Sequence, residues 1–265
     1  VETYRMLDSH GVRMTPKAFA IGVRVEHPQE LINKIQYGRW WREPALPPAE
    51  YSLAVRVSET GRSAYTFCMC PGGEVVCCSS AEGEVVTNGM SYSRRDGSCA
   101  NSAVVVNVSP EDFPGESPLD GLYYRGTWER KAFALGGNSY FAPAQKLVEF
   151  LKGEKGAVRE STYKPGITPA RMNDALPSYI ARTLRHGFLQ FEEKMPGYIS
   201  AEALMIGVET RTSSPVRVLR GPDLQSVSAG GLYPCGEGAG YAGGIMSSAL
   251  DGIRAAEALL DSLEG

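Results

Sequence analysis

Short stretches in which apolar and polar residues alternate recur through the chain, and this is the pattern of half-buried β-strands. We expect strands at residues 19–26, 52–57, 64–69, 74–80, 103–108, 203–210 and 216–219, with further β-rich sequence at 85–89. Residues 103–108 (AVVVNV) are apolar almost throughout, which is typical of a strand buried on both faces. Pro71-Gly72-Gly73 predicts a turn that folds the strand at 74–80 back beside the one before it.

Helical patterns lie between and after these strands. We expect helices at 3–10, 127–135, 143–150 and 244–263, and a helix pair at 169–187. In the pair, Thr168 can cap the first helix, Pro169 can occupy its first turn, and Gly187 would end the second helix. The apolar residues that share one face of the last helix are Ile245, Ala249, Ile253, Ala256 and Leu260. This mixture of elements predicts an α/β (α+β) fold.

Composition and charge narrow the class of protein. The 265 residues are 43% hydrophobic and 22% charged, which is ordinary for a soluble globular protein. The net charge of -3 argues against a nucleic-acid partner, and no apolar run is long enough to predict a membrane span. The amino terminus shows no signal-peptide pattern and no initiator Met, so we expect a truncated start and a cytoplasmic protein. The six cysteines do not form a secreted disulfide framework, which indicates reduced thiols.

A glycine-rich tail is the most informative segment. Residues 232–244 read LYPCGEGAGYAGG and are followed at once by the last expected helix. Such a loop aims backbone N–H groups and a helix N-terminus at an anion. Its glycines match G-x-G-x-x-G, but no second strand follows the helix, so we interpret the tail as returning to a nucleotide site built elsewhere. A glycine-rich helix entry that serves packing alone is the alternative.

The sequence also resembles a known family. The stretches that carry the resemblance are KAFAIGVRVEHPQ (17–29), TFCMCPGGEVV (66–76), TNGMSYSRR (87–95), ERKAFALGG (129–137), ETRTSSPVR (209–217) and GLYPCGEGAGYAGGI (231–245). They are similar to uncharacterised bacterial FAD-dependent dehydrogenases of the two-dinucleotide-binding flavoprotein type. The resemblance implies that 1–19 is a remnant of an FAD-binding domain, 20–200 an inserted substrate domain, and 201–265 the carboxy-terminal FAD-binding segment.

The resemblance also assigns roles in the tail. Glu237 would bind the ribitol chain of FAD, and the amides of Gly243, Gly244 and Ile245 would lie near the flavin. The remaining residues of the expected cofactor-binding segment are Gly236, Gly238, Gly240 and Tyr241. The family's amino-terminal ADP-binding unit does not occur in this sequence. We therefore expect this chain alone to be inactive and to bind FAD weakly or not at all.

The complete protein would then be an oxidoreductase that transfers a hydride between FAD and an unidentified small-molecule substrate. NAD(P) stays open as its electron partner, and the oligomeric state is not predicted. The polar loop Arg211-Thr212-Ser213-Ser214 would line the flavin face and orient an anionic substrate, or would be a solvated turn. Its first three residues are the catalytic candidates, together with Cys70.

The clustered thiols leave another alternative open. Cys68, Cys70, Cys77 and Cys78 lie on two expected strands, and the C-x-C spacing departs from the usual zinc knuckle. We predict no metal site, and we expect Cys68, Cys77 and Cys78 to be packing residues. A cysteine-based metal or thiol redox site, or a non-catalytic small-molecule-binding or regulatory module, remains the alternative function.

Overall fold

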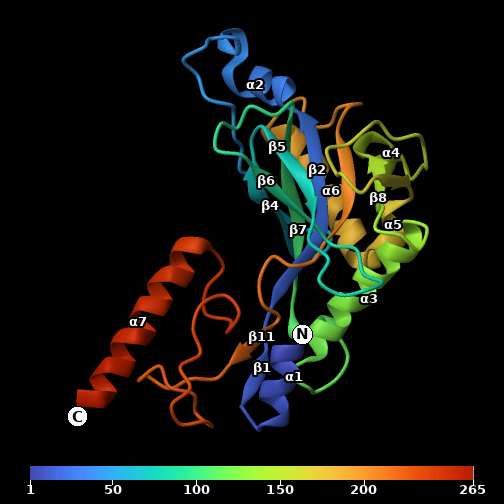
Figure 1. The fold of residues 1–265 in the computed structure, drawn as a ribbon. Helices are drawn as coiled ribbons and strands as arrows, with labels where there is room; N and C mark the ends of the chain where they lie inside the picture. The colour runs from blue at the N-terminus through green and yellow to red at the C-terminus, as the bar shows by residue number, and fades with distance from the viewer. Residues whose placement is uncertain (265) are drawn as a thin grey trace. The chain divides into compact units, whose positions relative to one another are not determined.

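The computed structural model describes residues 1–264, which form two compact units (Figure 1). The tail unit comprises Val1–Ala20, Val108–Arg125 and the segment that begins at Arg211. The sheet unit comprises Ile21–Asn107 and Gly126–Thr210. The chain therefore passes between the units four times.

The sheet unit is built on one seven-stranded sheet. In spatial order its strands are β3 (Ala54–Val57), β4 (Arg62–Cys70), β7 (Cys99–Val108), β2 (Phe19–Pro28), β10 (Leu204–Glu209), β8 (Ala142–Lys146) and β9 (Ile167–Pro169). The pairs β3–β4, β4–β7, β2–β10 and β10–β8 are antiparallel, and β8–β9 is parallel. The central strands β2 and β7 are buried at nearly every residue, which explains their apolar runs.

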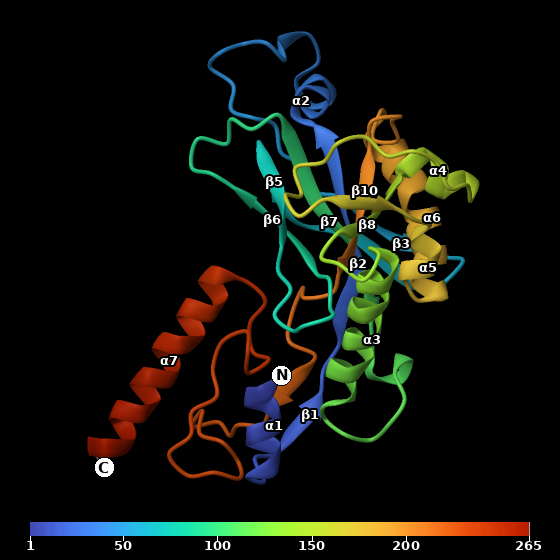
Figure 2. The same cartoon turned by 45° about the vertical axis from the view of Figure 1, so that its right-hand side comes forward.

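Both faces of this sheet are covered (Figure 2). On one face, α6 (Ser178–Lys194) packs against β3 and β4 and buries Ile180, Leu184, Phe188 and Phe191. On the other face, the two-stranded antiparallel sheet of β5 (Gly73–Cys77) and β6 (Thr87–Ser91) contacts β4 and β10. The other helices that lie wholly or partly in this unit are α2 (Gln29–Tyr37), the 3-10 turn η1 (Gly38–Trp40), α3 (Asp120–Leu135), α4 (Leu147–Lys152) and α5 (Met172–Ala175).

Helical structure differs from expectation in two regions. The helix expected at 143–150 is wrong, because Ala142–Lys146 is strand β8 and the helix α4 begins only at Leu147. The expected cap at Thr168 and first turn at Pro169 are also wrong, since both residues pair with β8 as part of β9. In each region the backbone hydrogen-bonds to a strand that is distant in sequence, and a short apolar window does not reveal such a partner.

Gly187 does not end a helix, contrary to expectation. It lies inside α6, and a Cβ added there would be 2.8 Å from the Cβ of Ala64 on β4. The missing side chain lets the helix approach the sheet closely.

The expected hairpin is wrong as well. β4 pairs with β3 and β7, whereas β5 pairs with β6. Gly72 does turn the chain, at φ 53°, but the turn directs β5 out of the main sheet.

The tail unit is smaller and holds the two ends of the described chain. Its elements are α1 (Glu2–Ser9), β1 (Met14–Pro16), the 3-10 turn η2 (Pro110–Asp112), β11 (Val216–Val218) and α7 (Ile245–Glu264), with the start of α3. β1 and β11 form a short antiparallel pair. The buried core consists of Val12, Met14, Leu119, Leu122, Val216 and Val218. Within residues 1–264, no helix is both long enough and apolar enough to span a membrane. The predicted α/β class is confirmed.

Candidate functional site

A pocket of about 210 Å³ in the tail unit brings together two segments that the sequence analysis selected separately. Its lining residues are Tyr4, Arg125, Arg211, Ser213, Ser214, Pro215, Glu237 and Gly238. We call it the arginine pocket. The predicted catalytic residues Arg211 and Ser213 thus share one cavity with the predicted cofactor residues Glu237 and Gly238, although 24 or more positions separate the two pairs in sequence.

Thr212 and Ser214 hold in place the loop that presents Arg211 and Ser213. Thr212 is buried, and its hydroxyl lies 3.1 Å from the amide N and 3.2 Å from the carbonyl O of Ala20. Ser214 is also buried, and its hydroxyl donates to the Val216 carbonyl over 2.7 Å. The structure therefore uses the Thr212 hydroxyl to hold the loop, and Arg211 and Ser213 are the half-exposed members.

Tyr4 is a site residue that the sequence analysis missed. Its hydroxyl donates to the Gly238 carbonyl over 2.6 Å and lies 2.9 Å from Ser214 Oγ, so α1 joins the two loops of the pocket. A single tyrosine on a short helix carries no signal for this role, because the helix pattern does not reveal which loop it meets.

The tail loop is attached to α7 through a buried acid. Asp251 accepts hydrogen bonds from the Arg220 guanidinium at 2.7 and 3.0 Å, and its Oδ2 also accepts from the Gly236 amide at 2.8 Å. The hydrogen bond from Arg220 holds the pKa of Asp251 below its usual value. Gly236 has φ 72°, a conformation that glycine adopts without strain. Asp251 was not among the predicted site residues, because an acid on a helix is normally a solvated side chain.

Contacts at Gly240 and Tyr241 attach the tail loop to β11. Arg217 donates to the Gly240 carbonyl at 3.1 and 3.2 Å, and the Tyr241 hydroxyl donates to the Val218 carbonyl at 2.8 Å. The Arg220 guanidinium lies 3.7 Å from the centroid of the Tyr241 ring. Both predicted cofactor residues therefore have structural contacts, and their roles toward a cofactor stay predictions.

The remaining glycines of the tail leave backbone accessible. A Cβ added at Gly238 or Gly243 would meet no atom within 4 Å. Tight packing therefore does not explain why these two positions are glycine. Glu237 is half-buried beside Gly238 and presents the one acidic side chain that lines the arginine pocket. An acceptor beside the exposed backbone of Gly238 fits a ligand that is rich in hydroxyl groups, as the ribitol chain of FAD is.

The N-terminus of α7 is also accessible. Gly243, Gly244 and Ile245 are all exposed, and the Gly244 amide donates to Ser247 Oγ at 3.1 Å. One amide of the first turn is therefore capped within the helix, and the positive end of the helix dipole faces outward.

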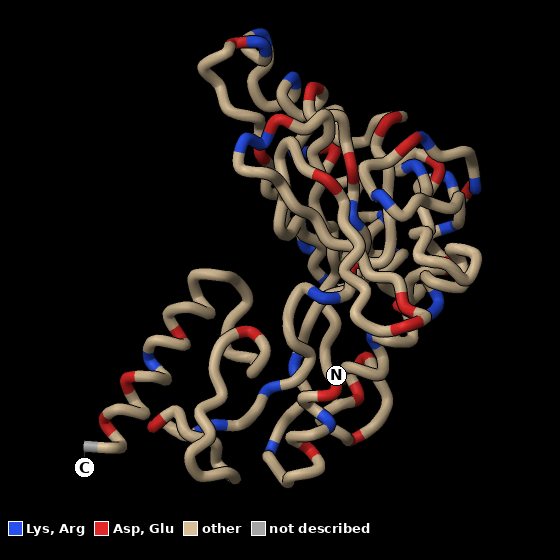
Figure 3. Tube along the Cα trace, viewed as in Figure 1, with Lys and Arg blue, Asp and Glu red and all other residues tan. Residues whose placement is uncertain are grey.

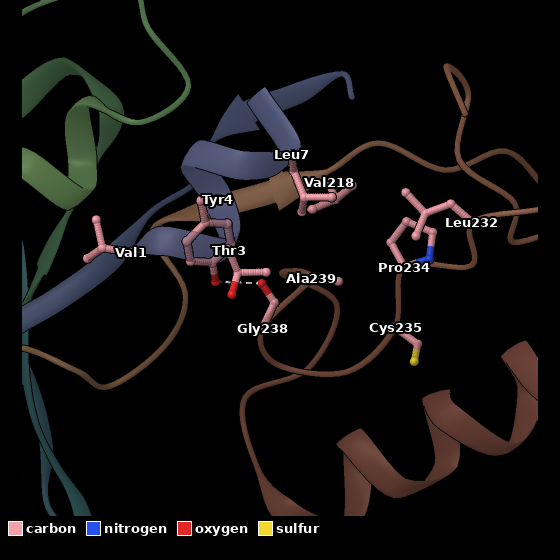
Figure 4. Close-up of a pocket in the computed structure, with 10 residues that line it drawn as sticks. All are labelled: Val1, Thr3, Tyr4, Leu7, Val218, Leu232, Pro234, Cys235, Gly238 and Ala239. Carbon is pink, nitrogen blue, oxygen red and sulfur yellow. Dashed lines mark hydrogen bonds between the residues drawn. The ribbon is translucent and has the colours of Figure 1, made fainter. Parts of the chain in front are cut away.

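An apolar pocket of about 360 Å³ adjoins the arginine pocket and shares Tyr4 and Gly238 with it (Figure 4). Its other lining residues are Val1, Thr3, Leu7, Val218, Leu232, Pro234, Cys235 and Ala239. Figure 4 shows the Tyr4–Gly238 hydrogen bond between α1 and the tail loop. The tail unit thus offers a polar and an apolar cavity side by side.

Positive charge is concentrated locally around the tail loop. Residues of both signs are interspersed along the trace (Figure 3), and the chain as a whole is acidic. Near the loop, burial and then the charge of Arg217 lower the pKa of Lys17, while Glu237 opposes this effect. With Arg125 and Arg211 in the pocket wall, the arrangement is suited to an anionic group.

The sheet unit contains a buried ion pair next to the C-x-C thiols. Arg24 is fully buried and forms a bidentate pair with Glu209 at 2.9 and 3.2 Å. Burial raises the pKa of Glu209 and Arg24 opposes this, and because an arginine stays protonated, Glu209 is its counter-charge. Cys70 is buried above Arg24, whereas Cys68 is exposed.

The expectation that Cys68 and Cys77 are packing residues is wrong, because both are exposed, and Cys78 is half-buried. Within residues 1–264, no group of three or more histidine, cysteine or acidic side chains is arranged to hold a metal ion.

The chain is similar to known proteins over most of its length. Residues 18–212 match the model of the family described as FAD-dependent protein, C-terminal domain-like. This chain belongs to that family. A protein of Clostridium beijerinckii named only as an uncharacterized protein is 48% identical over 267 residues, which cover 99% of this chain and 50% of the relative. The chain therefore spans about half the length of this relative. The family match ends at Thr212, so the tail loop lies outside it but inside the aligned relative.

Proposed function

We propose that this chain is the flavin-facing and substrate-binding part of an FAD-dependent oxidoreductase of the dehydrogenase type. The observation that carries the proposal is the arginine pocket, where Arg211 and Ser213 meet the Gly236-Glu237-Gly238 step. Membership in an FAD-dependent family supports a flavin as the ligand of this site. The hydride transfer, the small-molecule substrate and NAD(P) as electron partner are part of the proposal.

FAD, when bound, supplies the hydride chemistry, and the protein binds and orients the reactants. Glu237 accepts hydrogen bonds from ribitol hydroxyls at the open glycine backbone. Arg211 and Ser213 hold an anionic group of the substrate, since a guanidinium and a hydroxyl are the donors that such a group needs. Tyr4 keeps the two loops at a fixed separation through its contacts with Gly238 and Ser214.

The exposed apolar face of α7 supports a larger assembly around this site. Its strongly exposed apolar residues are Ile245 (89% exposed), Met246, Leu250, Ile253, Leu260 and Leu263 (75% exposed). A contiguous apolar surface of this kind is typical of an interaction site. In the proposed arrangement, the ADP-binding region of the complete protein covers this face, and residues 20–200 act as the substrate domain.

Titration of FAD into the complete apo-protein tests the proposal. Glu237→Ala should weaken FAD binding about ten- to a hundredfold, because a hydrogen bond to a charged group is worth about 1.5–3 kcal/mol. Glu237→Gln keeps one acceptor and should be milder. The matched control is Glu257→Ala on an exposed position of α7, which should leave the affinity unchanged. Equal affinities for wild type and both Glu237 variants would remove Glu237 from the site.

A second measurement tests the reaction. Anaerobic mixing of the FAD-loaded complete protein with NADH or NADPH should bleach the visible flavin absorbance. An apo-protein that binds no FAD at all would refute the proposal as a whole.

A further inference from the structure

We propose that Cys68 and Cys70 form a redox-active dithiol that reduces a disulfide substrate, with Cys68 as the nucleophile and Cys70 as the resolving thiol. The site lies in the sheet unit and requires neither FAD nor the arginine pocket. It therefore goes beyond the proposed flavin function, and its test is independent of that function.

Cys68 and Cys70 lie at an irregularity of strand β4. Residues two apart in a regular strand are about 6.6–6.8 Å apart at Cα, which is the outer limit for a disulfide. Here the register between β4 and β7 shifts between Phe67 and Cys70, and Cys68 has φ 48°, in the left-handed region. At this irregularity Cys70 Sγ lies 3.4 Å from the Cys68 carbonyl O, and the two thiol side chains are close enough to interact. A non-glycine residue in this conformation is uncommon and often marks a functional position.

The two thiols differ in their exposure to solvent. Cys68 is exposed and accessible to a substrate, whereas Cys70 is buried beneath it. The active thiol predicted from the sequence was Cys70, and the structure favours Cys68 for the first attack on grounds of access. Burial restricts the access of a substrate to Cys70, which suits it to the second, resolving step.

The Arg24 guanidinium, which is paired with Glu209, contacts both residues of the pair. Arg24 Nη1 donates to the Cys68 carbonyl at 2.7 Å and lies 4.0 Å from Cys70 Sγ. Its other contacts, to Glu209, Asn88 and Asn101, fix the guanidinium in place. Glu209 is the acid that faces the pair, and burial raises the pKa of the adjacent Tyr51 so that its phenol stays neutral.

The pKa shifts of the two thiols agree with Cys68 as the nucleophile and Cys70 as the resolving thiol. A hydrogen bond from Cys70, followed by the charge of Arg24, lowers the pKa of Cys68 to about 6, although partial burial opposes this. The same hydrogen bond, together with burial, raises the pKa of Cys70. These directions favour a Cys68 thiolate beside a protonated Cys70, which is the form that attacks a disulfide.

The reaction balances with a disulfide as the oxidant. The Cys68 thiolate attacks one sulfur of the substrate, the substrate S–S bond breaks, and the first thiolate leaves and takes a proton from water. Cys70 then gives its proton to water and attacks Cys68 Sγ, which expels the second substrate thiolate. Two electrons have passed to the substrate, and the protein holds a Cys68–Cys70 disulfide. A thiol reductant regenerates the dithiol.

Alkylation kinetics test the nucleophile. With a pKa near 6 instead of 8.5, Cys68 is about 160-fold richer in thiolate at pH 6, while its intrinsic nucleophilicity is about 10- to 20-fold lower. Iodoacetamide should therefore modify Cys68 about tenfold faster than free cysteine at pH 6, with a midpoint near pH 6. Mass spectrometry of the digested protein assigns the modified residue. A midpoint near 8.5 for Cys68 would overturn the proposal.

Disulfide capture tests the resolving step. Wild-type protein treated with oxidised glutathione should form the Cys68–Cys70 bond. Cyanogen bromide cuts after Met69, between the two cysteines, so their fragments should stay joined without reductant and separate with it. Cys70→Ser should instead retain glutathione on Cys68, and Cys68→Ser should give neither product.

The matched control is Cys77→Ser, which removes an exposed thiol that donates to Ser79 Oγ. This variant should behave like wild type in both assays. Joined fragments in Cys70→Ser, or separate fragments in treated wild type, would overturn the proposal. The alkylation test uses wild-type protein, so its result does not depend on whether the serine variants fold.

Discussion

The sheet unit should lose stability in mild acid because of one buried histidine. His27 lies in β2 with no exposed surface, and its Nε2–H donates to the Tyr198 carbonyl over 2.8 Å. Its ring also packs on the Tyr198 ring, with centroids 4.7 Å apart. Burial lowers the pKa of His27 to about 4, the hydrogen bond to Tyr198 opposes this, and the charge of Arg159 adds to it.

The sign and size of the effect follow from this pKa. Because the folded-state pKa is below the ordinary value of 6.5, the unfolded chain binds more protons between about pH 6.5 and pH 4. The buried, neutral His27 therefore contributes its full amount to folding stability above pH 6.5, and this contribution is lost as the pH falls through 4. Each pKa unit is worth about 1.4 kcal/mol, so the full loss is about 3 kcal/mol, of which about 2 kcal/mol has occurred by pH 5.

Guanidinium unfolding at pH 7.5 and pH 5.0 measures this loss. Tryptophan fluorescence reports on the sheet unit, because Trp40, Trp41 and Trp128 all lie in it. His27→Phe keeps an aromatic ring and removes the titration, so its free energy of unfolding should fall about 2 kcal/mol less than that of wild type between the two pH values. His186→Ala, at a half-exposed position, should fall as much as wild type. Equal pH dependence in His27→Phe and wild type would refute the reasoning.

Further substitutions test the packing of α6, the fastening of the tail loop and the cofactor content of this chain. Gly187→Ala should destabilise the sheet unit by about 1–3 kcal/mol, because the new Cβ overlaps Ala64. Gly252→Ala on α7, where a Cβ meets nothing within 4 Å, should instead stabilise by about 0.5–1 kcal/mol, and denaturant titration compares the two. Asp251→Ala should speed hydrogen exchange of the Gly236 amide at least about tenfold, and an unchanged rate would show that this contact does not order the loop. Purified alone, this chain should be nearly colourless, and stoichiometric bound FAD in its absorbance spectrum would contradict that expectation.

The sequence alone determined the elements whose pattern is local. The alternation at β2 and β4, the apolar run of β7 and the helical period of α7 appear in the structure close to their expected bounds. These signals are readable because the period of a helix, or the apolar run of a strand that is buried on both faces, lies in consecutive residues. The glycine-rich tail was also recognisable, since several glycines around one acid are unusual in a packed loop.

Only the tertiary structure decided which strands pair and where helices end. β8 is a strand because β10 offers it backbone hydrogen-bonding partners about sixty residues away, and its own five residues do not indicate this. β5 leaves the main sheet and pairs with β6, and the sequence of the turn before it does not predict this direction. Gly187 stays helical because α6 packs on Ala64, a contact that no local rule contains.

The chemistry of the candidate sites was also decided by tertiary contacts. The sequence named Arg211 and Glu237 from separate motifs, but the pocket that they share exists because Tyr4 and Ser214 join their loops. It selected Cys70 as the active thiol, whereas the exposure of Cys68 and the burial of Cys70 favour Cys68 for the first attack. Arg24, 44 positions from Cys68 in sequence, contacts the Cys68 carbonyl and Cys70 Sγ, and only the sheet brings it there. A local pattern specifies what a segment can form, and charge and burial are set by the segments that the fold packs against it.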